Sequence, residues 1–171
     1  MKSARLSPGF IAVNTAMMWL TTAIASAALW PIYRSDQIVL LIVVITVAAS
    51  VVAILGAVFR WPGYVMVLAT LGLYLAFGVP LAVPSDALYG ILPTPDGLVS
   101  LLTGTALGWK QLLTITLPVG GYQSLLVPAF VLILLSVIIG LSVALRSKRG
   151  DLVVLAPAAL FIIAIAFGPE R

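Results

Sequence analysis

Long apolar runs without a single charged residue constrain this chain more than any other feature. The clearest run covers residues 38–59 and reads IVLLIVVITVAASVVAILGAVF. Its 22 residues would form roughly 33 Å of α-helix, close to the roughly 30 Å hydrocarbon thickness of a bilayer. Lipid offers no hydrogen-bond partners to the backbone, so such a run must be helical. The pattern predicts an all-α integral membrane protein.

The overall composition supports a membrane protein and excludes several kinds of chemistry. Hydrophobic residues make up 63% of the chain and charged residues only 8%, too few to cover a globular surface in water. The chain contains no cysteine and no histidine, which removes disulfides, thiolate nucleophiles, imidazole bases and the usual zinc and haem ligands. We therefore expect no catalytic residue, no cofactor and no metal site.

The apolar runs predict five membrane spans in one transmembrane domain that covers residues 1–171. The expected spans are residues 10–30, 38–59, 64–83, 124–145 and 152–167, and residues 84–123 form a long segment between the third and fourth spans. Short connectors join the first three spans, so neighbouring helices should pack antiparallel.

The distribution of basic residues predicts the orientation. Six of them fall on the side of the N-terminus and serve as topology anchors: Lys2, Arg5, Arg60, Arg146, Lys148 and Arg149. Only Arg34, Lys110 and Arg171 fall on the other side. Because cytoplasmic loops are enriched in Lys and Arg, the N-terminus should be cytoplasmic, and residues 84–123 and the C-terminus should be extracytoplasmic.

Two alternative topologies fit the sequence less well. A sixth span through residues 98–119 would abolish the charge asymmetry, so five spans are preferred. The sequence Ala25-Ser26-Ala27 resembles a signal-peptide cleavage site. The preceding apolar run of about 20 residues exceeds the 7–15 residues usual for the apolar region of a signal peptide, so we expect no cleavage there.

The segment 84–123 should contain an amphipathic helix that lies on the outer membrane surface. Thr94 suits an N-cap, Pro95 the first helical position and Asp96 the positive end of the helix dipole, which predicts a helix over residues 95–114. A possible partner-binding surface on this helix comprises Leu101, Leu102, Trp109, Lys110 and Leu113. The helix could instead simply seal the end of the bundle.

Within the spans, polar residues are few and none is charged. Asn14 is the most costly polar residue to bury, and contact with headgroups or a neighbouring helix would explain it. Gly72, Gly78 and Gly140 are expected to allow close helix approach. The chain shows no phosphate-binding loop, dinucleotide fingerprint or nucleophile motif.

Several short strings in a fixed order resemble one family. They are GVPL at residues 78–81, LPTP at 92–95, GWKQ at 108–111 and LPVG at 117–120. Together with their surroundings they resemble the N-terminal membrane domain of bacterial, especially actinobacterial, transglutaminase-like membrane proteins. The resemblance covers about residues 38–169.

This resemblance implies a bacterial plasma-membrane protein with an extracytoplasmic domain that carries a Cys-His-Asp triad. No residue of that triad maps onto this chain, which lacks Cys and His. The expected role is therefore a membrane anchor and platform, with the chain a fragment of a longer protein whose catalytic domain is covalently linked at its C-terminus. The alternatives are a small transporter or channel subunit, or a scaffold that recruits partners through the outer helix.

Overall fold

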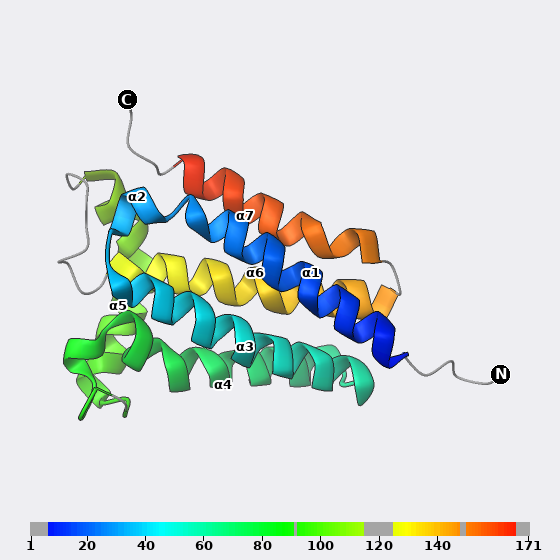
Figure 1. The fold of residues 1–171 in the computed structure, drawn as a ribbon. Helices are drawn as coiled ribbons and strands as arrows, with labels where there is room; N and C mark the ends of the chain where they lie inside the picture. Colours follow the sequence, from blue (N-terminus) through cyan, green and yellow to red (C-terminus); the bar gives the residue numbers. More distant parts are fainter. Residues whose placement is uncertain (1–6, 91, 115–124, 148–149, 167–171) are drawn as a thin grey trace.

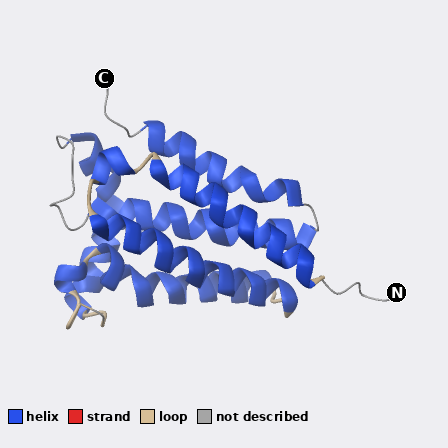
Figure 2. Ribbon diagram, viewed as in Figure 1, coloured by secondary structure: helices blue, strands red, loops and turns tan. Residues whose placement is uncertain are grey.

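A computed structural model describes residues 7–90, 92–114, 125–147 and 150–166 of the chain. This part of the chain is almost entirely helical, and its only β-type pairing is an isolated antiparallel bridge between Leu88 and Leu92 (Figure 2). The helices are α1 (Pro8–Ala27), α2 (Trp30–Tyr33), α3 (Asp36–Val58), α4 (Gly63–Ala82), η1 (Pro84–Asp86), α5 (Pro95–Thr114), α6 (Leu126–Ser147), η3 (Gly150–Val154) and α7 (Leu155–Ala166).

Five helices lie side by side, with α6 at the centre of the bundle. Helix α6 packs against α1, α3, α4 and α7, and it carries more buried side chains than any other described helix. Successive long helices run in opposite directions, so α3 and α6 end where α4 and η3 begin (Figure 1). We call this the Arg146 end, because Arg146 lies in the last turn of α6.

Helix α5 has a different orientation from the other long helices. It lies across the opposite end of the bundle, where α1, α4 and α7 end (Figure 1), and packs against both α4 and α6. We call this the α5 end. The predicted helix over residues 95–114 is therefore confirmed, and it runs across the bundle instead of along it.

Four of the helices are long and apolar enough to cross a membrane: α1, α3, α4 and α6. Their bounds lie within a few residues of the predicted spans, and the all-α membrane-protein class is supported. The fifth predicted span, residues 152–167, corresponds to η3 and α7, which together form a shorter apolar helical segment, Asp151–Ala166.

The first predicted span, about residues 10–30, extends three residues beyond the end of α1. Helix α1 ends at Ala27, and α2 starts at Trp30 after a break. Pro31, at the start of α2, has no backbone N–H to extend the hydrogen-bond series of α1. The first helix therefore ends three residues earlier than the apolar run suggests.

Local sequence signals explain where several helices begin and end. The Ser7 hydroxyl accepts a hydrogen bond from the Phe10 N–H at 3.2 Å at the start of α1. At the end of α3, Arg60 adopts a left-handed φ of 53°, and the Trp61 N–H donates to the Gly56 carbonyl at 2.9 Å. This is the Schellman arrangement, which returns the chain sharply into α4.

Two of the three expected glycine contacts are present. A Cβ at Gly78 would lie 2.5 Å from Leu101 Cδ2, and one at Gly140 would lie 3.1 Å from the Ala156 Cβ. These positions therefore permit close approach of α4 to α5 and of α6 to α7. The expectation is wrong for Gly72, where a Cβ would meet nothing within 4 Å.

Side-chain hydrogen bonds hold the first turns of α5 against η1, which follows α4. The Thr94 hydroxyl accepts from the Gly97 N–H at 3.0 Å, as expected of an N-cap, and also donates to the Asp86 carbonyl. The Asp86 carboxylate accepts from Ser100 Oγ at 2.7 Å. The segment between α4 and α5 is thus connected to α5 through both its backbone and its side chains.

Candidate functional site

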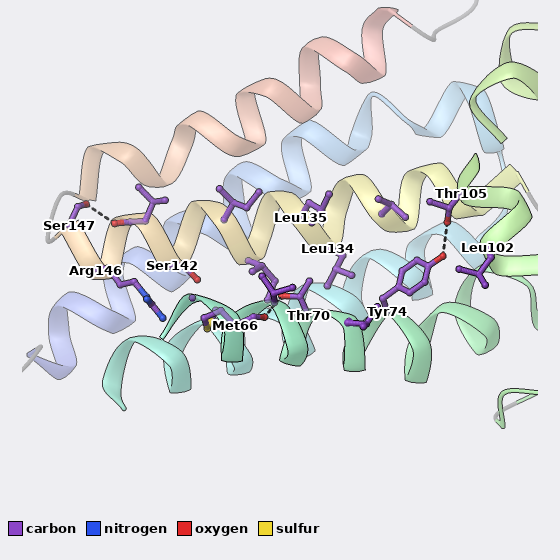
Figure 3. Close-up of a pocket in the computed structure, with 17 residues that line it drawn as sticks. Met66, Thr70, Tyr74, Leu102, Thr105, Leu134, Leu135, Ser142, Arg146 and Ser147 are labelled. Atoms are coloured by element: carbon purple, nitrogen blue, oxygen red, sulfur yellow. Dashed lines mark hydrogen bonds between the residues drawn. The ribbon is translucent and has the colours of Figure 1, made fainter. Parts of the chain in front are cut away.

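An apolar groove with a volume of about 930 Å³ lies between α4 and α6. Met66, Thr70 and Tyr74 line it from α4, and Leu134, Leu135 and Ser142 line it from α6 (Figure 3). Leu102 and Thr105 of α5 close one end, and Arg146 and Ser147 lie at the other (Figure 3). The groove therefore runs along the bundle from the Arg146 end towards α5.

Most polar groups along the groove are already satisfied within the protein. Thr70 donates to the carbonyl of Met66 at 2.8 Å, and Ser147 donates to the carbonyl of Val143 at 2.6 Å. The hydroxyls of Tyr74 and Thr105 share a hydrogen bond of 2.7 Å. Because these hydroxyls are hydrogen-bonded within the protein, the walls of the groove are effectively apolar.

The Arg146 end of the groove has a positively charged group in a defined position. Arg146 Nη2 donates to the Trp61 carbonyl at 2.8 Å and to the Gly56 carbonyl at 3.3 Å. Both carbonyls belong to the C-terminal turn of α3 and the connector that follows it, where the helix dipole favours a cation. Arg146 thus links α6 to the junction between α3 and α4.

The structure brings together two of the six predicted topology anchors. Arg60 and Arg146 are both exposed and lie at the same end of the bundle, since Arg146 binds the carbonyl of Trp61, the neighbour of Arg60. Lys2, Arg5, Lys148 and Arg149 lie outside the described residues.

The predicted partner surface on α5 needs one correction. Leu101 is 0% exposed and packs against Gly78, so the prediction that it forms part of an exposed surface is wrong. Leu102 is exposed and lines the groove, whereas Trp109 is half-buried and donates its Nε1–H to the Thr105 carbonyl. Lys110 is exposed, and the side chain of Leu113 lies outside the described residues.

The groove was not predicted from the sequence, although one residue pattern points to it. Met66, Thr70 and Tyr74 recur every four residues along α4 and therefore share one face of that helix. A face that combines a hydroxyl, a phenol and a thioether is unusual in a span made mostly of branched aliphatic residues. This periodicity could have identified the face, but it could not show which helix lies opposite.

The arrangement of these groups suits binding more than bond-making chemistry. The groove offers hydrocarbon walls, one guanidinium and one unpaired hydroxyl, since Ser142 Oγ is buried without a hydrogen-bond partner in the described residues. Within the same residues, no group of three or more His, Cys, Asp or Glu side chains could hold a metal ion.

Comparison of the chain with protein-family models, with curated proteins and with solved structures gave no match.

Proposed function

We propose that this chain is the membrane anchor and platform of an extracytoplasmic transglutaminase-like enzyme domain. The family is suggested by the sequence resemblance over about residues 38–169. The observation that carries the anchoring role is the packing of the bundle around α6. Large apolar side chains on three helices are fully buried there: Met18, Leu41, Ile45, Phe130, Ile133 and Leu141.

A solid apolar core favours an anchor over a transporter. Ion and substrate pathways in membrane proteins are generally marked by ionisable side chains within the spans. In this chain the predicted spans contain no such residue, and the buried polar groups are hydroxyls and one amide. The amide, Asn14, donates to the Phe10 carbonyl of its own helix at 2.8 Å, so one of its two donors is used within α1.

The α5 end would provide the platform. Helix α5 is connected to α4 by the Tyr74–Thr105 hydrogen bond, and to η1 by the contacts of Asp86 with Thr94 and Ser100. Helix α7 ends at this same end of the bundle (Figure 1), so a domain that followed α7 would stand beside α5. In the proposed orientation this end faces outward from a bacterial plasma membrane.

The size of the natural polypeptide tests the proposal. An antibody against residues 84–123 should detect, in native membranes, a protein much larger than 17.9 kDa. After immunopurification, that protein should hydrolyse or cross-link peptide amides and lose this activity on thiol alkylation. A natural product of 17.9 kDa, or a larger protein without thiol-dependent amide chemistry, would contradict the proposal.

A further inference from the structure

We propose that the groove between α4 and α6 binds an anionic phospholipid, with an acyl chain along the groove and the headgroup phosphate at Arg146. This inference is independent of the enzyme family suggested above. It depends on the chemistry of the groove walls, on the group at one end and on the length of the groove.

The walls of the groove favour a hydrocarbon chain as ligand. The hydroxyls of Thr70, Tyr74 and Thr105 are engaged with one another or with backbone carbonyls, so they offer little to a polar ligand. Val67 on the groove wall is 67% exposed, which leaves the groove open along the side of the bundle. In a membrane, this side faces the acyl chains of the bilayer.

At the Arg146 end, the guanidinium of Arg146 favours an anionic group on the ligand. Two backbone carbonyls hold Nη2 in place, while Nη1 and Nε donate to no atom in the described part of the chain. Both two-donor edges of a guanidinium include Nη2, which the two carbonyls occupy, so Nη1 and Nε can each donate singly to an anionic oxygen beside a fixed positive charge. Arg146 is therefore positioned in advance for a phosphodiester, and it loses little freedom when the lipid binds.

The groove is long enough for an acyl chain of one leaflet. Its lining extends from Gly63 to Tyr74 along α4 and from Val131 to Ser147 along α6, roughly 16 and 24 Å of helix, whereas one leaflet contributes roughly 15 Å of hydrocarbon. A lipid whose phosphate sits at Arg146 would thus place its acyl chain beside Met66, Thr70 and Tyr74. With the N-terminus cytoplasmic, this would be a lipid of the inner leaflet, where basic residues attract anionic headgroups.

A second copy of the chain is the competing occupant. An apolar helix could fill the walls of the groove equally well, but its aliphatic side chains would bring no negative charge to Arg146. An anionic lipid satisfies both the walls and the arginine, and for this reason we favour it.

Native mass spectrometry of the purified protein in detergent tests the proposal. Phosphatidylglycerol and phosphatidylcholine with identical acyl chains are added in equal amounts, and the lipid retained by the protein is measured. We expect phosphatidylglycerol to be retained in preference by about fivefold, the effect expected for one basic residue near a headgroup. Arg146→Gln keeps an amide donor for the carbonyls of Gly56 and Trp61 but removes the charge, so it should abolish the preference.

A matched pair of variants tests the walls separately from the charge. Val67→Trp places a bulky side chain in the groove and should reduce retention of both lipids. Leu68→Trp makes the same change at a neighbouring position of α4 that is 61% exposed and does not line the groove, and it should behave like the wild-type protein.

Several results would overturn the proposal. They are equal retention of the two lipids by the wild-type protein, an unchanged preference in a folded Arg146→Gln variant, or unchanged retention in Val67→Trp. A dimer without bound lipid that Val67→Trp converts to a monomer would assign the groove to a second copy of the chain. If Arg146→Gln fails to fold, the wild-type preference and the Val67/Leu68 pair still decide the question.

Discussion

The contact between Leu101 of α5 and Gly78 of α4 should dominate the stability of the α5 end. Leu101 is 0% exposed, and a Cβ at Gly78 would lie 2.5 Å from its Cδ2 and 2.9 Å from its Cδ1. Truncating a fully buried leucine typically costs about 2–5 kcal/mol, because the lost contacts are accompanied by a cavity. We expect Leu101→Ala to lower the free energy of unfolding by an amount in the lower half of that range, roughly 2–3 kcal/mol, since α5 lies at the end of the bundle.

The neighbouring residue supplies the control. Leu102 is 56% exposed, so Leu102→Ala should change stability by no more than about 0.5 kcal/mol. Unfolding in mixed micelles is followed by the fluorescence of Trp109 in a background where Trp19, Trp30 and Trp61 are replaced by phenylalanine, so that the signal reports on α5. Equal effects of the two alanine substitutions would refute the burial of Leu101.

A double-mutant cycle makes the test more specific. In the wild-type background, Gly78→Ala should destabilise the protein by about 1 kcal/mol net, because overpacking of about 1–3 kcal/mol exceeds the helix-propensity gain of about 1 kcal/mol. In the Leu101→Ala background the colliding methyl groups are gone, so the same substitution should stabilise the protein by up to about 1 kcal/mol. Additive effects of the two changes would show that these residues do not meet.

Three smaller predictions concern helix ends and a buried hydroxyl. Thr94→Ala removes the cap of the Gly97 N–H and should cost about 1 kcal/mol by chemical unfolding, whereas an unchanged midpoint would exclude the cap. Arg60→Gly should stabilise the protein by about 1 kcal/mol in thermal melts, because Arg60 has a φ of 53° that glycine adopts freely, and a loss of stability would contradict this. Tyr33→Phe should cost about 1–3 kcal/mol, because it leaves the Leu125 carbonyl, now bound at 3.0 Å, without its donor. Burial raises the pKa of Tyr33. Its contribution to the free energy of unfolding should therefore be constant near neutral pH and decline above about pH 10, where the phenol of Tyr33 ionises in the unfolded chain. The same alkaline decline in the wild-type protein and in Tyr33→Phe would contradict this.

The helices could be predicted from sequence because their causes are local. The apolar run of residues 38–59 is long enough to cross a bilayer by itself, and α3 follows it within two residues at either end. Thr94, Pro95 and Asp96 carry the chemistry of a helix start, and α5 begins at Pro95. Neither result depends on which helices are neighbours.

The groove and the role of Leu101 depend on neighbours and could not be predicted. The apolar positions of α5 occur on more than one side, and only the position of Gly78 on α4 determines that Leu101 is buried and Leu102 exposed. Likewise, the sequence shows Arg146 only as one of the six basic residues on the side of the N-terminus. Its contacts with the carbonyls of Gly56 and Trp61 span 90 and 85 residues of sequence, which no local pattern reports.

The most direct test of the membrane-platform account is two-sided labelling of single cysteines. The chain has no native cysteine, so Ser85→Cys and Ser147→Cys each provide one reactive thiol, at the α5 end and at the Arg146 end respectively. In intact cells, a membrane-impermeant maleimide should label the cysteine at position 85, and the cysteine at position 147 should react only after the membrane is permeabilised. Labelling of both positions from the same side would contradict the five-span orientation and, with it, the extracytoplasmic platform.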